Sequence, residues 1–216
     1  MKTAVIISGG SLDPDFALAF LREEKPELLI GADRGICFLK EKGIHPTHIV
    51  GDFDSASGDA LEYFKQFPEI PIRTFNPVKD FTDTAIAMEL AMEEGADRIY
   101  ILGGTGTRLD HVVANIKLLS HALERKKECI LMDAHNRIRL IDQPLTIEKK
   151  KQYGKYVSLF AFGGQVKGLT LRGFFYPLTE YDMTPENPIG VSNEITAENG
   201  EISFSSGMLL VMESKD

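Results

Sequence analysis

Short apolar runs alternate with stretches of helical spacing along the first part of the chain. The apolar runs have the length of buried strands, end in glycine or a polar turn, and cover residues 4–7, 28–30, 48–50, 72–75 and 99–102. Between them, apolar residues recur at helical spacing over residues 16–21, 36–42, 81–92 and 109–123. Strands that alternate with helices in this way predict a mainly parallel sheet flanked by helices.

The pattern changes near residue 135. Beyond it, short runs with strand chemistry are punctuated by Gly, Pro and Asn, and they cover residues 138–141, 156–162, 169–171, 189–191, 202–204 and 208–212. We therefore predict an α/β domain over residues 1–135, followed by a small all-β sandwich domain over residues 136–216. The charged run at residues 148–151 is interpreted as a solvated turn.

Composition and charge narrow the class of protein. Of the 216 residues, 43% are hydrophobic and 26% are charged, which excludes a disordered, collagenous or coiled-coil chain. A count of 24 Lys and Arg against 32 Asp and Glu gives a formal net charge of −8, which argues against a nucleic-acid partner or an anionic membrane surface. A phosphate ligand would need a metal cation or a local cluster of donors to offset that negative field.

The cysteines and the N-terminal residues indicate the cellular compartment of the protein. Cys37 and Cys129 are far apart and form no CxxC or Cys/His cluster, so neither a disulfide framework nor a structural zinc is expected. The apolar run at residues 4–7 is too short for the core of a signal peptide, and no apolar stretch approaches the roughly 20 residues of a membrane span. We expect a soluble cytoplasmic protein.

An acidic pair follows the predicted strand at residues 48–50. In the Gly-Asp-Phe-Asp-Ser segment of residues 51–55, Asp52 and Asp54 share a face if the chain is extended. Two neighbouring carboxylates repel unless a cation bridges them or one holds a proton, and ligands of open parallel sheets bind beyond the carboxyl ends of strands. The spacing therefore favours a metal site over a solvated loop in which Ser55 or Ser57 caps the next helix.

A second polar segment, residues 76–83, precedes the helix predicted at residues 81–92. Asp80, Thr82 or Asp83 would suit the start of a helix as a cap or as a charge on its dipole. A hydroxyl, spare carboxylates and Lys79 at a helix start also suit a phosphate-and-metal site. Both interpretations stay open on the residues alone.

A glycine-rich turn at residues 103–107 follows the strand predicted at residues 99–102 and opens a helix. It lacks the Gly-Lys-Ser/Thr ending of a P-loop, and Leu109 stands where a dinucleotide fingerprint has its third glycine. Arg108, His111 and Asn115 follow at i, i+3 and i+7 and form one polar edge of the helix. Beside a glycine loop, these three residues are interpreted as ligand contacts.

Two further segments are uninformative alone. Asp33 follows a predicted strand, where an aspartate is usually a helix cap. Residues 190–194 (Gly-Val-Ser-Asn-Glu) form a polar stretch that is usually a hairpin turn.

Together with the others, these segments resemble the thiamine pyrophosphokinase family. The resemblance rests on five motifs that occur in order, at residues 33–35, 51–55, 79–83, 102–111 and 190–194. It implies an α/β catalytic domain that binds ATP and Mg²⁺, followed by a β-sandwich that helps to bind thiamine. It also implies transfer of the pyrophosphoryl group of ATP to the thiamine hydroxyl, which yields thiamine diphosphate and AMP, and a homodimer with active sites at the subunit interface.

The resemblance assigns roles residue by residue. It implies that Asp52, Asp54 and Asp83 hold Mg²⁺ and that Asp33 lies in the same site. A carboxylate near the thiamine hydroxyl would accept its proton, with Asp33, Asp54, Asp83 and water all open as the base. The residues expected to contact ATP or thiamine are Lys79, Thr82, Gly104, Arg108, Asp110, His111, Ser192 and Asn193, the last two toward thiamine.

Other functions remain to be separated from this one. Another Mg²⁺-dependent kinase or pyrophosphokinase of a small alcohol would keep the carboxylates, and product analysis for AMP or ADP followed by a substrate screen would distinguish it. A non-enzymatic sensor of nucleotide or thiamine would show no turnover. A nicotinamide oxidoreductase is disfavoured by the imperfect glycine fingerprint.

Overall fold

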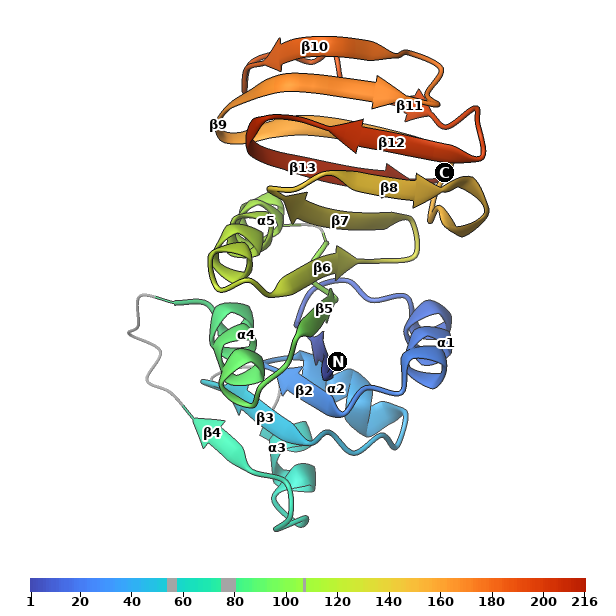
Figure 1. Ribbon diagram of the computed structural model, residues 1–216. Helices are drawn as coiled ribbons and strands as arrows, with labels where there is room; N and C mark the ends of the chain where they lie inside the picture. The colour runs from blue at the N-terminus through green and yellow to red at the C-terminus, as the bar shows by residue number, and fades with distance from the viewer. Residues whose placement is uncertain (54–57, 75–80, 107) are drawn as a thin grey trace. The chain divides into compact units, whose positions relative to one another are not determined.

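The computed structural model describes residues 1–53, 58–74, 81–106 and 108–216 (Figure 1). By its internal contacts the chain divides into two compact units, Met1–Ala134 and His135–Asp216.

The first unit is built on a parallel sheet. Its strands run side by side in the order β4-β3-β2-β1-β5-β6, and each neighbouring pair is parallel. The bounds are β1 (Thr3–Ile7), β2 (Leu28–Ala32), β3 (His48–Gly51), β4 (Ile72–Thr74), β5 (Arg98–Leu102) and β6 (Glu128–Met132). The parallel sheet predicted from the alternating pattern is therefore confirmed, and β6 is a strand that we did not predict.

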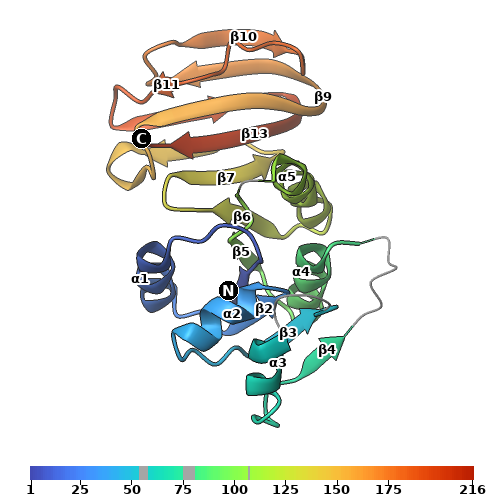
Figure 2. The same cartoon turned by 180° about the vertical axis from the view of Figure 1, so that it is seen from behind.

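The helices of this unit lie on both faces of the sheet. They are α1 (Pro14–Glu24), α2 (Gly35–Glu41), α3 (Gly58–Phe64), α4 (Asp83–Glu93) and α5 (Leu109–Glu124). The chain steps outward from β1 to β4 and then returns to β5 on the other side of β1, and Figures 1 and 2 show α4 and α5 on the opposite side of the sheet from α1. Strand order therefore reverses between β1 and β5, which is where open α/β sheets bind ligands.

Two of the predicted helical stripes are wrong at their first residues. Phe81 lies before α4 and is 70% exposed, while Leu109 and Val113 on α5 are 73% and 52% exposed. The side of α5 that meets the protein carries Leu119 and Ala122 instead. No helix in the described part of the chain is long and apolar enough to cross a membrane.

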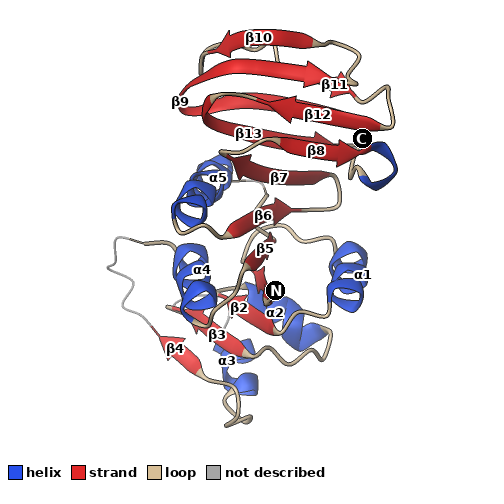
Figure 3. Cartoon of the chain, in the orientation of Figure 1, coloured by secondary structure: helices blue, strands red, loops and turns tan. Residues whose placement is uncertain are grey.

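The second unit is made of strands with one short 3₁₀ segment, η1 (Lys149–Lys151), as Figure 3 shows. Its strands are β7 (Asn136–Ile141), β8 (Leu145–Glu148), β9 (Tyr156–Arg172), β10 (Leu178–Met183), β11 (Asn193–Glu194), β12 (Asn199–Ser203) and β13 (Ser206–Ser214). The predicted all-β character is confirmed. Strands β8, β10 and β11 were not predicted, and residues 189–191, which we expected to be a strand, form a turn in which Ile189 and Val191 are exposed.

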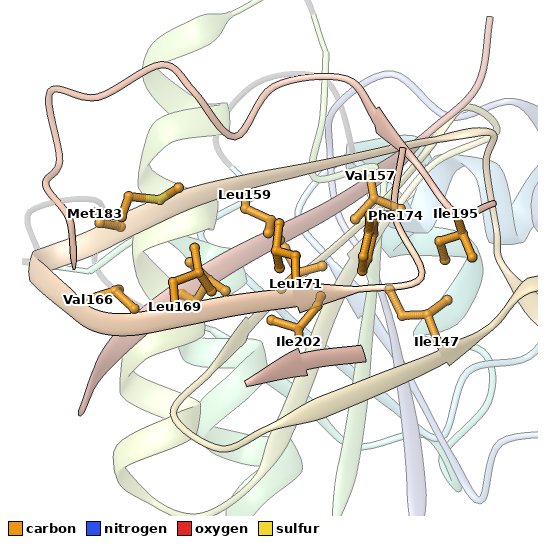
Figure 4. Close-up of a cluster of buried hydrophobic side chains, with 13 residues drawn as sticks. Ile147, Val157, Leu159, Val166, Leu169, Leu171, Phe174, Met183, Ile195 and Ile202 are labelled. Carbon is orange, nitrogen blue, oxygen red and sulfur yellow. The ribbon is translucent and has the colours of Figure 1, made fainter. Parts of the chain in front are cut away.

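A single long strand, β9, joins the layers of this unit. Its first half pairs with β13 and its second half with β12 and β10, so the runs predicted as separate strands at residues 156–162 and 169–171 belong to one strand. Gly163 and Gly168 have positive φ values of 71° and 65°, a backbone conformation that glycine adopts without strain. The buried side chains of both halves face one core, which Figure 4 shows with Leu159 and Leu171 among its members.

Candidate functional site

A cavity of about 450 Å³ opens in the first unit at the reversal of strand order. The loop after β1 and the loop after β5 both line it, as do the starts of α4 and α5. Its lining includes Ser8, Gly9, Gly10, Asp33, Thr82, Asp83, Thr84, Gly103, Gly104, Arg108, His111 and Asn115. Of the predicted contacts, the structure therefore brings Asp33, Thr82, Asp83, Gly104, Arg108 and His111 to one cavity.

Close backbone packing explains the glycines of these two loops. A Cβ at Gly10 would lie 2.4 Å from the carbonyl oxygen of Gly103, and a Cβ at Gly103 would lie 2.5 Å from that of Ser8. Gly103 also has a positive φ of 68°, and the Gly10 N–H donates to its oxygen at 2.8 Å. Side chains at either position would push the loops apart and change the cavity.

An acidic cluster forms one part of the site. Asp33, Asp52 and Asp83 come from the end of β2, the end of β3 and the first turn of α4, and each offers a carboxylate oxygen within 4.8 Å of the others. All three are partly buried. Hard divalent cations prefer carboxylate oxygens, so this donor set fits Mg²⁺.

The surroundings of Asp33 raise its pKa above the ordinary 3.8. Burial is the main cause, and the nearby charges of Asp83 and Asp52 add to it, because all three effects disfavour the ionised form. Asp33 also has a positive φ of 48°, which aspartate and asparagine tolerate better than most residues. It does not cap α2, because Arg34 occupies that position.

The start of α4 combines the two roles that the sequence left open. Thr82 is the N-cap, and its hydroxyl accepts a hydrogen bond of 3.2 Å from the N–H of Ala85. Asp83 occupies the first turn and belongs to the acidic cluster. Capping therefore accounts for Thr82, and the carboxylate of Asp83 remains directed at the cluster.

The start of α5 presents an exposed ion pair. The guanidinium of Arg108 donates from Nε and Nη2 to the two carboxylate oxygens of Asp110, at 3.2 Å and 2.6 Å. This pairing lowers the pKa of Asp110 to about 2. Arg108 is the N-cap of α5 but makes no capping bond with its side chain, so its guanidinium is held near the cavity by Asp110.

Asn115, the third residue of the polar edge that we interpreted as ligand contacts, lies at the wall of the cavity. It is buried, and its Nδ2 donates to the carbonyl oxygen of Gly104 at 2.7 Å. Although it lines the cavity, its amide also fixes the backbone of the glycine loop.

In the second unit, Ser192 and Asn193 have different surroundings. Ser192 is exposed and has a positive φ of 56°. Asn193 is 5% exposed, accepts from the N–H groups of Tyr176 and Glu194, and donates to the carbonyl oxygen of Tyr176 at 2.8 Å. The side chain of Asn193 is thus engaged in holding the turn, whereas Ser192 is exposed.

Two predicted site residues, Asp54 and Lys79, lie outside the described residues. Sequence reasoning also missed Ser8 and Thr84, which line the cavity. Ser8 and the glycines after it were read only as the end of a strand. A glycine pair directly after the first strand of an α/β pattern was the signal that could have identified this loop as part of a site.

A doubly wound sheet with glycine loops and carboxylates at its switch point is typical of α/β domains that bind a phosphorylated ligand with a divalent cation. The model of the thiamin pyrophosphokinase catalytic domain matches residues 22–131, and that of the thiamin pyrophosphokinase vitamin B1 binding domain matches residues 143–209. A thiamine pyrophosphokinase of Bacillus subtilis (strain 168) is 33% identical over the full length of both chains.

Solved structures agree with these matches. The crystal structure of thiamine pyrophosphokinase from Bacillus subtilis has a TM-score of 0.88 at 32% identity, and both chains are covered completely. That of the protein from Geobacillus thermodenitrificans has a TM-score of 0.83 at 31% identity, with 100% of this chain and 98% of the other covered. The Candida albicans protein, at 19% identity and a TM-score of 0.80 over 98% of this chain and 90% of its own, shares the fold.

The chain belongs to the thiamin pyrophosphokinase family. It is therefore an enzyme, and the family assignment made from the five ordered motifs is confirmed.

Proposed function

We propose that the protein transfers the pyrophosphoryl group of ATP to the hydroxyl of thiamine. A bond forms between the thiamine oxygen and the β-phosphorus, and the bond from that phosphorus to the bridging α-β oxygen breaks, so that AMP leaves with the bridging oxygen. The thiamine hydroxyl loses its proton to a carboxylate of the site or to water. The observation that carries the proposal is the acidic cluster beside a glycine-lined cavity at the switch point, in a chain that matches the family along its length.

The triphosphate would lie in the cavity of the first unit. The helices α4 and α5 both begin at the cavity wall, and their first N–H groups attract anions through hydrogen bonds and the helix dipole. Arg108 would turn its planar guanidinium from Asp110 toward phosphate oxygens, or contact both together, which its donors allow. His111 and the backbone of Gly104 would border the same ligand.

The acidic cluster would hold Mg²⁺ through Asp33, Asp52 and Asp83, with Asp54 as a further ligand proposed from the family motif. When bound, the ion neutralises charge on the phosphate oxygens. The protein's own contribution is to place these carboxylates beside the phosphates. Without such a cation, the carboxylates and the triphosphate would repel each other.

The second unit would supply contacts to thiamine, because the vitamin B1 binding domain model matches it. Ser192 is exposed, and the exposed rings of Phe175 and Tyr176 lie next to the segment that Asn193 holds. We also propose a homodimer, since exposed apolar side chains such as Phe175, Ile189 and Val191 are typical of interaction surfaces. Sedimentation analysis that finds only monomer at assay concentration would contradict it.

Product analysis tests the reaction. Incubation with ATP, Mg²⁺ and thiamine is expected to yield thiamine diphosphate and AMP in equal amounts, and Asp52→Asn is expected to lose nearly all turnover because a metal ligand is lost. Asp15→Asn, which removes a carboxylate from α1, is the matched control and should be fully active. Formation of ADP and thiamine monophosphate would show a different reaction, and near-wild-type turnover of Asp52→Asn would contradict the role of the cluster.

A further inference from the structure

Two buried hydroxyls meet at the wall of the cavity and take no part in the roles assigned above. The Oγ of Ser8 and the Oγ1 of Thr84 lie 2.6 Å apart, and the side chains come from the end of β1 and the first turn of α4. Both residues line the cavity, and they are only 8% and 6% exposed. A hydroxyl taken from water needs a partner to offset its desolvation, and here each is the partner of the other.

Packing alone does not account for this pair. Replacing both partners of a buried hydrogen bond by apolar groups of the same shape is often nearly neutral for stability. What a hydrogen bond adds over apolar contact is a fixed direction and distance. The pair therefore holds one element in a defined position relative to another.

Ser8 connects the elements that border the cavity. Its N–H donates to the carbonyl oxygen of Leu102 at 2.8 Å, at the end of β5. Its own carbonyl oxygen lies so close to Gly103 that no side chain fits there. Through its hydroxyl it also reaches Thr84, so the loop after β1, the glycine loop after β5 and the start of α4 are joined at one residue.

Thr84 directly follows Asp83, a member of the acidic cluster. The carboxylates of that cluster repel one another when no cation is present, and this repulsion acts to push the first turn of α4 away from the ends of β2 and β3. The hydrogen bond to Ser8 opposes that displacement. Thr82 caps the same turn through Ala85, but this bond lies within the helix and does not tie it to the sheet.

We propose that Ser8 and Thr84 are positioning residues, which hold Asp83 in place for a divalent cation and fix its distance from the glycine loop. The inference rests on the proposed function only for the identity of the reaction. Positioning of a metal ligand is measurable without turnover. Outer partners of metal ligands typically contribute about 10- to 100-fold in metal affinity or activity.

The experiment compares Thr84→Val, Thr84→Ser, Ser8→Ala and Thr3→Val. Thr84→Val keeps the shape of the side chain and removes the hydroxyl, and Thr84→Ser restores the hydroxyl. Thr3 is a buried threonine at the opposite end of β1, so Thr3→Val is the matched control for loss of a buried hydroxyl. Each protein is titrated with Mn²⁺ in the absence of nucleotide, with free Mn²⁺ followed by electron paramagnetic resonance, and the Mg²⁺ dependence of turnover and the Tm are measured beside it.

Thr84→Val and Ser8→Ala are expected to weaken Mn²⁺ binding about 10-fold and to raise the Mg²⁺ needed for half-maximal turnover to a similar extent. Thr84→Ser should bind Mn²⁺ like the wild type, and Thr3→Val should change only the Tm. The inference is overturned if Thr84→Val binds Mn²⁺ normally, if Thr84→Ser does not rescue binding, if Thr3→Val weakens binding equally, or if the wild type binds no Mn²⁺. A wild-type protein without pyrophosphoryl transfer would contradict the proposed function, whereas the Mn²⁺ comparison would still decide this inference.

Discussion

Replacing Asp33 by asparagine should stabilise the metal-free protein and weaken its response to Mg²⁺. The carboxylate oxygens of the acidic cluster lie at most 4.8 Å apart. At that separation, two unit charges repel by about 0.9 kcal/mol at the dielectric constant of water, ~80, and by about 3.5 kcal/mol at an effective value of ~20. Asp33 takes part in two such pairs, with Asp52 and with Asp83.

Solvent screening at a half-buried site favours the lower of these values, so Asp33→Asn should gain about 2 kcal/mol when no cation is bound. For a protein of this size, that gain corresponds to a Tm increase of about 4–8 °C. Asparagine also suits the positive φ of this residue, so backbone strain should not offset the gain.

The gain should depend on pH. The folded-state pKa of Asp33 lies above its ordinary 3.8, so the folded protein holds the proton more tightly than the unfolded chain. The contribution of Asp33 to stability is then greatest below pH 3.8 and is lost as the pH rises through the folded-state pKa. The Tm difference between Asp33→Asn and the wild type should vanish at the acidic end and grow toward neutral pH.

Calorimetry in EDTA, and then with increasing Mg²⁺, provides the assay. Mg²⁺ at about 100 times its Kd should stabilise the wild type by about 2.7 kcal/mol, and should stabilise Asp33→Asn much less. Asp15→Asn controls for the change in net charge and should lower the Tm slightly, since it removes a favourable charge from the first turn of α1. A variant no more stable than the wild type in EDTA, or equally stabilised by Mg²⁺, would refute the reasoning.

Four other substitutions have expected outcomes. Arg108→Lys keeps the charge but loses the bidentate hydrogen-bonding geometry of the guanidinium, so kcat/KM for ATP should fall by about 10-fold or more. Unchanged kinetics would show that Arg108 is a surface residue without a role in catalysis. Asn193→Ala should cost about 1–3 kcal/mol in urea unfolding because backbone groups of Tyr176 lose their partner. By contrast, Ser192→Gly, which suits the positive φ, should raise the KM for thiamine without lowering stability. Glu213 is fully buried and paired with two arginines, so Glu213→Gln should lower the free energy of unfolding by about 3–5 kcal/mol. A decrease smaller than the error of urea unfolding would show that stability does not depend on this network.

The alternating pattern was sufficient to predict the parallel sheet and its helices. Buried parallel strands are short apolar runs, and helices between them show their own spacing, so both signals are local. Strand β6 was missed although its residues 129–132 form an apolar run of strand length, separated from the apolar positions of α5 by the charged residues 124–128. Strand β9 was divided because its bend passes through glycines, which in sequence are typical of a turn.

Residue types were also sufficient to indicate much of the site, since several carboxylates and a glycine-rich turn follow predicted strands, where open parallel sheets bind ligands. The sequence did not decide which polar side chains reach the cavity and which form hydrogen bonds with main-chain groups. Asn115 and Asn193 have the same chemistry as a ligand contact, yet each is hydrogen-bonded to main-chain groups. A short polar side chain makes whichever hydrogen bond the packing of distant segments brings within reach.

The residues themselves determined the chemistry available to this protein: paired carboxylates that need a cation, a guanidinium near a glycine loop, and helix starts that attract anions. Only the tertiary structure decided that Asp33, Asp52 and Asp83 converge from three different elements, and that Ser8 meets Thr84 across 76 residues of chain. The physical reason is the reversal of strand order beside β1. It brings the ends of strands that are remote in sequence to one edge of the sheet, and local patterns carry no information about that order.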